Sequence, residues 1–261
     1  MAERKFFRKI RIIFMFFILF LVGGDALLTR LRTTDWDAPL LVAIYPVNGD
    51  KSAVADKYIK QLSQDDFADV ATFLEEEAKE YKLELAHPVE ISFRKQIAEC
   101  PPMPPVDRNV LGVMWWSLKL RYWVWQVKRQ SKPTADVQIF VLYYDPKQHD
   151  RLAHSLGIQK GLIGVVNAFA HQSYSSQNNI IVAHEFLHTV GATDKYDLTT
   201  GMPTYPQGFV EPDKEPLYPQ EFAEIMAGSI PTSKIKHKMP ESLVETIVGV
   251  ETAVDIGWID P

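Results

Sequence analysis

The stretch IIVAHEFLHTVGATDKYD, residues 180–197, constrains the fold of this chain more than any other. His184 and His188 are four residues apart, so on a helix they project from one face, one turn above the other. Apolar residues surround them in the pattern of a helix with one buried side: Ile180, Ile181, Ala183, Leu187 and Val190. The stretch therefore predicts a largely buried helix that brings two imidazoles together.

A glycine and an aspartate follow this predicted helix. Gly191 can adopt the positive φ that ends a helix and turns the chain back, which would bring Asp194 under the two histidines. Two histidines and a carboxylate leave a fourth position for water, an arrangement typical of catalytic zinc sites. Glu185, about 100° around the helix from His184, would act as general base and then general acid on that water. We therefore predict one Zn²⁺ ion bound by His184, His188 and Asp194, with Glu185 as the catalytic residue.

The charge and cysteine content narrow the function classes. The 261 residues carry a net charge of −5, but residues 1–11 alone carry five basic side chains and one acidic one. The remaining body is therefore strongly acidic and would repel phosphates, which argues against a nucleic-acid partner. Cys100 is the single cysteine, which excludes an intramolecular disulfide framework and a cysteine-based zinc cluster.

The N-terminus has the pattern of an export segment. After the basic start, residues 12–24 (IIFMFFILFLVGG) contain no polar side chain. Small residues around Asp25 suit a cleaved signal peptide, whereas Leu27, Leu28, Arg30 and Arg32 suit a longer membrane helix. We favour an uncleaved signal anchor in which residues 10–31 contact the lipid bilayer. Both versions place the body outside the cytoplasm, either tethered or secreted.

Strand and helix patterns alternate along the body. Strands are predicted at 38–49, 89–97, 136–145 and 161–170, with 136–145 as a central strand. Helices are predicted at 53–83 with a break near 64–66, at 109–130, at the histidine motif and at 241–256. Between them, residues 199–220 hold five prolines and two glycines, so we expect an irregular segment there. This order indicates a mixed α/β layer.

The predicted helix at 109–130 is rich in tryptophan. We interpret it as a core helix with one broad apolar face. Its basic residues leave open a role at a membrane surface or with a partner protein. They are Lys119, Arg121, Lys128 and Arg129, and the tryptophans are Trp115, Trp116, Trp123 and Trp125.

The motif HEFLHTVGATD resembles the extended signature of the metzincin metalloproteases, in its snapalysin-like variant with Asp as the third zinc ligand. The resemblance implies a Met-containing turn beneath the metal, for which FAEIMAGS supplies Met226. It also implies that residues 161–168 form the edge strand along which a substrate peptide lies extended. The residues concerned are Gly161, Leu162, Ile163, Gly164, Val165 and Val166.

Three features leave parts of the site open. Asp197 lies close enough to Asp194 to compete as a ligand or to orient a histidine. In another zincin arrangement the third ligand is a later Glu, here Glu221 or Glu224. Some metzincins have a Tyr two residues after the Met, where this chain has Gly228. An oxyanion-stabilising Tyr would then come from elsewhere, and the candidates are Tyr196, Tyr205 and Tyr218.

These patterns predict an α/β (α+β) zincin-like fold behind an N-terminal segment of residues 1–35. In the domain 36–261, residues 36–191 form a mixed-sheet lobe ending in the active-site helix, and 192–261 form a small irregular lobe with the Met turn. The predicted function is a zinc-dependent endopeptidase for peptide or protein substrates, tethered in a bacterial cell envelope with its body on the periplasmic or extracellular face. Alternatives are an exported binding or scaffold protein with a vestigial zinc site, and zinc hydrolysis of a non-peptide amide such as a cell-wall cross-link.

Overall fold

The structure, a computed structural model, describes residues 11–12, 15–16, 35–105 and 109–260. Most of the predicted export segment, and with it the expected lipid contact of residues 10–31, lies outside these residues. Within the described ranges, no helix has the length and apolar character needed to cross a membrane.

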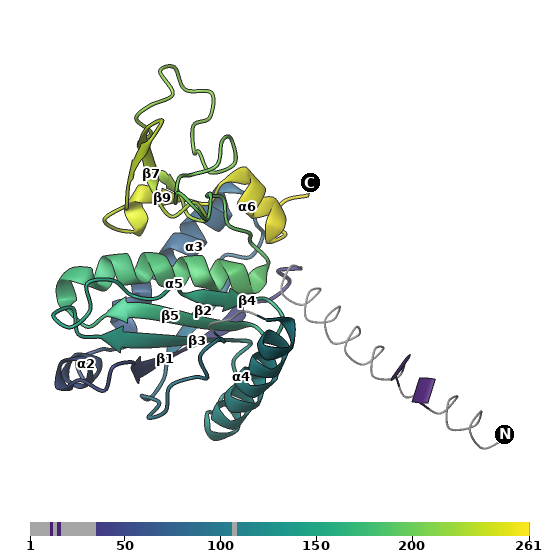
Figure 1. Cartoon of the computed structure of the whole chain (residues 1–261). Helices are drawn as coiled ribbons and strands as arrows, with labels where there is room; N and C mark the ends of the chain where they lie inside the picture. Colours follow the sequence, from purple (N-terminus) through teal and green to yellow (C-terminus); the bar gives the residue numbers. More distant parts are fainter. Residues whose placement is uncertain (1–10, 13–14, 17–34, 106–108, 261) are drawn as a thin grey trace.

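A five-stranded sheet forms the centre of the domain, as the alternating pattern predicts (Figure 1). Its strands lie in the order β2-β1-β3-β5-β4. The first four are mutually parallel, and β4 runs antiparallel to β5. The bounds are β1 Leu40–Asn48, β2 Val89–Phe93, β3 Val137–Tyr144, β4 Leu156–Ile158 and β5 Ile163–Phe169. The prediction of a central strand at 136–145 is confirmed, since seven of the eight β3 residues are buried.

The edge-strand prediction for residues 161–168 is wrong. β5 pairs with β3 on one side and with β4 on the other, so it lies inside the sheet. Gly161 and Leu162 precede it, Ile163, Gly164 and Val165 are paired on both sides, and Val166 is paired with β3. The edge strand next to β5 is β4, whose three residues are too few to show a period-two pattern in the sequence.

Helices cover both faces of the sheet (Figure 1). Side chains alternate along β1, so that Val42 and Ile44 face one apolar core while Ala43 and Tyr45 face the other. The first core includes residues of α2 Ala53–Ile59, η1 Gln64–Phe67, α3 Ala68–Glu80 and α5 Ser175–Val190. The second core is closed by α4 Val110–Gln130. The predicted break near 64–66 is confirmed as a 3-10 turn, in which Ser63 and Asp66 form a capping box.

The chain after α5 packs as a second, irregular lobe above that helix (Figure 1). Between Gly191 and Phe222 the described chain has no helix and only one isolated bridge, which confirms the irregular segment predicted at 199–220. The short elements of this lobe are β6 Ala223–Glu224, β7 Ile230–Ser233, β8 Lys236–Lys238, η3 Leu243–Glu245, β9 Thr246–Ile247 and α6 Val250–Asp255. Outside the lobe, the 3-10 helix η2 Gln172–Tyr174 directly precedes α5.

The terminal helix predicted at 241–256 is wrong over most of its length. Only α6 is α-helical, Leu243–Glu245 form the 3-10 helix η3, and the following Thr246 and Ile247 pair in parallel with Ala223 and Glu224. Both are β-branched, and pairing with a distant strand overrides the helical spacing of the apolar residues around them. This pairing ties the middle of the irregular lobe to its C-terminal part.

Candidate metal centre

The helix α5 ends where the sequence predicts. Gly191 has a φ of 122°, and its N–H donates to the carbonyl of Leu187 at 3.1 Å. A Cβ on Gly191 would lie 2.9 Å from Gln159 Nε2 and 3.0 Å from the Asp255 carbonyl, so a side chain there would meet both strain and crowding. The chain therefore reverses after Val190 and returns towards His184 and His188.

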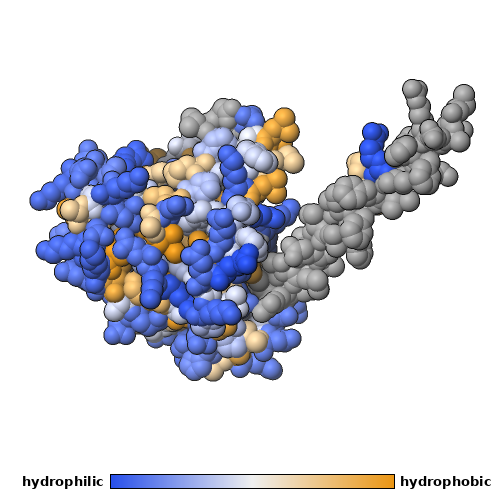
Figure 2. All heavy atoms as spheres, turned by 90° about the horizontal axis from the view of Figure 1, so that it is seen from below, coloured by the Kyte–Doolittle hydropathy of each residue, from blue (hydrophilic) through white to orange (hydrophobic). Residues whose placement is uncertain are grey.

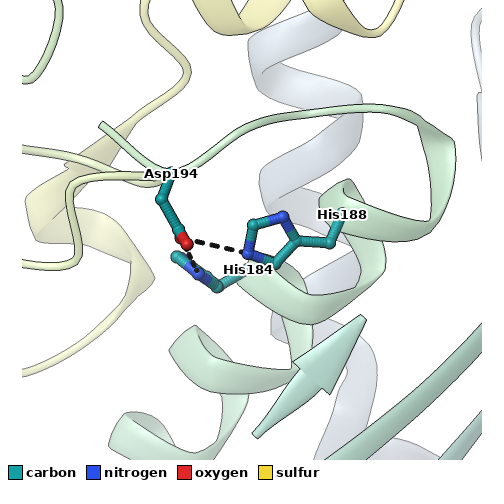
Figure 3. A group of neighbouring side chains, drawn as sticks. All are labelled: His184, His188 and Asp194. Atoms are coloured by element: carbon teal, nitrogen blue, oxygen red, sulfur yellow. Dashed lines mark ion pairs between the residues drawn. The ribbon is translucent and has the colours of Figure 1, made fainter. Parts of the chain in front are cut away.

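Three donor atoms converge at this reversal (Figure 3). Asp194 Oδ1 lies 3.3 Å from His184 Nε2 and 3.1 Å from His188 Nε2. The donor atoms of all three residues lie within 4.8 Å of one another. Ligands about 2.0–2.2 Å from a tetrahedral zinc would lie about 3.3–3.6 Å apart, close to the two distances seen here. The residues therefore fit a zinc ion without rearrangement of the backbone.

Backbone carbonyls orient both imidazoles. His184 Nδ1 lies 2.9 Å from the Ile225 carbonyl, and His188 Nδ1 lies 2.9 Å from the Ala192 carbonyl. A carbonyl only accepts hydrogen bonds, so each Nδ1 carries the proton that it donates. Each Nε2 can then offer its lone pair to a metal, as is usual for histidine ligands whose other ring nitrogen donates a hydrogen bond.

The charges of the cluster are strongly coupled. Burial alone would raise the pKa of Asp194, but His184 and His188 in their protonated forms also donate from Nε2 to Asp194, and these hydrogen bonds and charges hold its pKa well below its usual range. Burial alone would lower the pKa of His184, yet the hydrogen bond to Asp194 and the charge of Glu185 raise it. A concentrated negative charge facing two imidazoles is suited to a divalent cation.

Glu185 lies in the same helix and is only 5% exposed. Burial raises the pKa of its carboxyl group, although the charges of His184 and His188 partly oppose that shift. Among the described residues, its Oε2 is buried without a hydrogen-bond partner. A buried carboxylate oxygen with no protein partner costs free energy, and such exceptions mark functional positions.

A turn at residues 224–228 supports His184 from below. Met226 is fully buried in the same apolar core as Ala183 and Leu187 of α5. The Ile225 carbonyl that accepts the His184 proton belongs to this turn. Glu224 is also fully buried, and its carboxylate accepts hydrogen bonds from Ala227 N, Gly249 N and Thr252 Oγ1 at 2.7–3.1 Å. The turn that contains Met226 thus contacts His184 through the Ile225 carbonyl, and Glu224 holds the turn.

Contacts from the last helix hold the loop that carries Asp194. Asp255 Oδ2 accepts hydrogen bonds from the backbone N and hydroxyl of Thr193, at 3.1 and 2.8 Å. Lys195, only 8% exposed, pairs with the same oxygen at 2.6 Å. The backbone N of Lys195 also donates to the Met226 carbonyl at 3.0 Å. The residues on both sides of Asp194 are therefore bonded to structure that lies far along the chain.

The strand β4 packs directly against α5 beside the ligands. A Cβ on Gly157 would overlap His188 Cβ and lie 2.6 Å from the carbonyl of Glu185. Only glycine allows this approach of strand and helix. Gly157, Ile225 and Ala192 are not recognisable as site residues in the sequence, since their roles depend on backbone atoms that leave no side-chain pattern.

The other candidates are separated from the cluster. Asp197 Oδ1 accepts from the backbone N of Thr199 and of Thr200, at 3.0 and 2.8 Å, and so caps its own turn. Glu221 pairs with Lys214 at 3.3 Å, while the carboxylate of Glu224 accepts hydrogen bonds from Ala227 N and Gly249 N. Tyr205 is exposed and points to the Pro212 carbonyl, and Tyr218 packs on Phe209.

Tyr196 is the tyrosine that the structure places at the cluster. Burial and the nearby charges of Asp194 and Glu185 raise the pKa of its hydroxyl group.

A concavity of about 520 Å³ lies away from the cluster, between β2, η1 and α3, and includes Gln64 and His87. No cluster residue lines it.

No protein-family model matches this chain, and a comparison with curated proteins finds no match. The candidate metal centre therefore stands on its own geometry: two helix-borne imidazoles, one loop-borne carboxylate and a buried glutamate beside them.

Proposed function

We propose that this chain is a zinc-dependent endopeptidase with a zincin-like, metzincin-type architecture. The observation that carries the proposal is the convergence of His184, His188 and Asp194 beside a buried Glu185 with an unpartnered oxygen. The antiparallel edge strand beside the motif helix and the buried methionine turn support it further. His184, His188 and Asp194 would hold the ion, which would polarise a substrate carbonyl and lower the pKa of water.

The residues of the chain have separate tasks in this reaction. Glu185 would take the proton from the attacking water and pass it to the departing amine, which its burial and raised pKa favour. Tyr196, with its half-buried hydroxyl group, would donate a hydrogen bond to the developing oxyanion. The carbonyls of Ile225 and Ala192 would keep both histidines in the required tautomer.

An extended peptide is the substrate that best suits the surroundings of the cluster. Among the described strands, β4 pairs with β5 alone, so its second edge has no strand partner. That strand contacts α5 at Glu185 and His188 through Gly157. A peptide added as a further strand would gain backbone hydrogen bonds and lie beside the ligands.

The test is a Glu185→Gln substitution in a zinc-loaded protein. The amide keeps the size of the side chain but cannot accept a proton, so we expect zinc content to remain and hydrolysis of a peptide library to fall by about 10²–10⁴-fold. Zinc is measured by elemental mass spectrometry and cleavage by peptide mass spectrometry. Glu211→Gln, which alters an exposed glutamate paired with Lys214, is the matched control.

Two outcomes would contradict the proposal. Retained hydrolysis in Glu185→Gln would refute the assigned role of that residue. A zinc-loaded protein that cleaves no library member would instead favour an exported binding protein with a vestigial site, and cleavage of a cell-wall amide alone would favour a non-peptide substrate.

A further inference from the structure

The helix α4 carries two apolar faces, only one of which the fold uses. Leu120, Val124 and Val127 point into the core and are buried. A second set recurs at short helical intervals along the outside and is 49–77% exposed. We call this set the outer stripe, and it consists of Leu111, Met114, Trp115, Leu118, Tyr122 and Trp125.

The outer stripe is more than scattered surface hydrophobicity. From Leu111 to Trp125 it spans about 21 Å at 1.5 Å per residue. Figure 2 views the domain from below and shows apolar side chains (orange) on that side among hydrophilic ones (blue). Isolated apolar residues are normal on a surface, whereas a continuous row marks an interaction site.

The charge around the outer stripe has one sign. Within Val110–Gln130 there are two lysines and two arginines but no acidic residue, although the whole chain carries a net charge of −5. Lys119 Nζ lies 5.6 Å from the Trp115 ring, and Arg129 lies 4.7 Å from the Trp125 ring. The cations therefore lie along the stripe itself, which suits a partner that is apolar inside and anionic at its surface.

We propose that the outer stripe of α4 lies in the headgroup region of an anionic lipid bilayer. Trp and Tyr prefer this region, and nearby Lys and Arg are attracted by anionic lipids. A second copy of the chain fits less well, because a two-fold interface would set the stripe against itself. Lys119 and Arg129 would then face like charges, with no acid in the helix to compensate. The inference does not depend on the proposed enzymatic function.

The bilayer contact would orient the domain. The sequence independently predicts a bilayer segment at residues 10–31, nine residues before β1 begins at Leu40. The chain after α4 returns to the same end of the sheet, where Asp136 N donates to the Leu41 carbonyl at 2.8 Å. Since α4 and α5 cover opposite faces of the sheet, the His184 cluster would face away from the bilayer (Figure 1).

Spin labelling of the full chain tests this contact. In a Cys100→Ser background, one label is placed by Leu118→Cys in the stripe and another by Leu198→Cys, at a position that is 81% exposed in the second lobe. The protein is reconstituted into phosphatidylglycerol or phosphatidylcholine vesicles. Accessibility of each label to oxygen and to a water-soluble nickel chelate is measured by electron paramagnetic resonance.

We expect the oxygen-to-nickel accessibility ratio at position 118 to exceed that at 198 by roughly fivefold in phosphatidylglycerol, and by much less in phosphatidylcholine. Lys119→Gln combined with Arg129→Gln should remove most of the difference between the two lipids. Lys234→Gln combined with Lys236→Gln, at exposed positions in the second lobe, should leave it unchanged. Circular dichroism checks that each variant is folded.

Three results would overturn the proposal. Equal nickel access at positions 118 and 198 in phosphatidylglycerol would show that the stripe stays in water. Spin–spin broadening between labels at position 118 would identify a second copy as the occupant. If the label at position 118 were equally protected from the nickel chelate in both lipids, and the loss of Lys119 and Arg129 changed nothing, anionic headgroups would not be recognised.

Discussion

The two halves of the candidate metal centre are held by different kinds of structure. His184 and His188 share one face of α5, so their spacing follows from the helical repeat within five residues. Asp194 lies in an irregular loop, and its neighbours are bonded to Asp255 and Met226, 31 or more residues further along the chain. Local geometry therefore positions the imidazoles, whereas the second lobe positions the carboxylate.

Removing a ligand from each half gives the largest expected effect. His188→Ala and Asp194→Ala should each lower zinc affinity by more than about 100-fold, since direct ligands matter more than their supporting contacts, which contribute about 10–100-fold. Competition with a fluorescent chelator measures the affinity. Asp197→Ala is the control, because that side chain caps its own turn. Unchanged zinc binding in Asp194→Ala would mean that the loop half does not belong to the site.

The support beneath His184 should matter next. Glu224→Gln places an amide group among the N–H groups of Ala227 and Gly249 and the hydroxyl group of Thr252. A buried donor without an acceptor costs about 1–3 kcal/mol of unfolding free energy. We expect that loss in chemical denaturation, together with about a tenfold loss of zinc affinity through the Ile225 carbonyl. Glu221→Gln, on the exposed side, should change neither quantity.

The link between the two lobes should have a smaller effect. Asp255→Asn weakens the pairing with Lys195 and the contacts that hold Thr193, so Asp194 becomes less well positioned. We expect a loss of zinc affinity of about tenfold or less, in line with other supporting contacts. The exposed Glu251→Gln on the same helix is the control. A loss of zinc affinity as large as that of Asp194→Ala would show that the position of Asp194 depends entirely on the contacts of Asp255.

The pH dependence of stability tests a buried carboxyl group outside the candidate metal centre. Burial raises the pKa of Glu77 to about 7, although its carboxylate accepts a hydrogen bond from Val248 N at 2.7 Å. The folded state then binds more protons than the unfolded state between about pH 4.5 and 7, so its stability should fall as pH rises through that range. In urea titrations, the difference in unfolding free energy between pH 5 and pH 8 should be smaller by about 1–3 kcal/mol in Glu77→Gln than in the wild type. The exposed Glu76→Gln should keep the wild-type slope.

Regular elements with a strong repeat could be predicted from the sequence. The helix predicted at 109–130 is α4 Val110–Gln130, and the strand predicted at 136–145 is β3. Both contain apolar runs whose length and bounding residues identify the element without knowledge of its tertiary partners. The strand β4 has three residues and no visible pattern, and the helix expected at 241–256 gave way to strand pairing of Thr246 and Ile247. Such elements depend on partners that are distant in the sequence.

The same division applies to the surface of α4. Its tryptophans and basic residues are visible in the sequence, which favours one broad core face and leaves open a role at a membrane surface or with a partner protein. The structure buries Leu120 and Val124 but leaves Trp115 and Leu118 exposed. Which side of an apolar helix faces the sheet depends on how α4 docks on β1 and β3, and a helix that is apolar on most sides does not encode that choice locally.

The sequence by itself determined which chemical groups the site could contain. The spacing of His184 and His188 and the glycine at 191 follow from backbone geometry over a few residues. Only the tertiary structure decided among the carboxylates. Asp194 contacts the histidines, Asp197 caps its own turn, and Glu224 is buried in the turn at 224–228. The physical reason is that the position of a loop side chain depends on long-range contacts, here those of Lys195 with Asp255 and Met226, which no local pattern records.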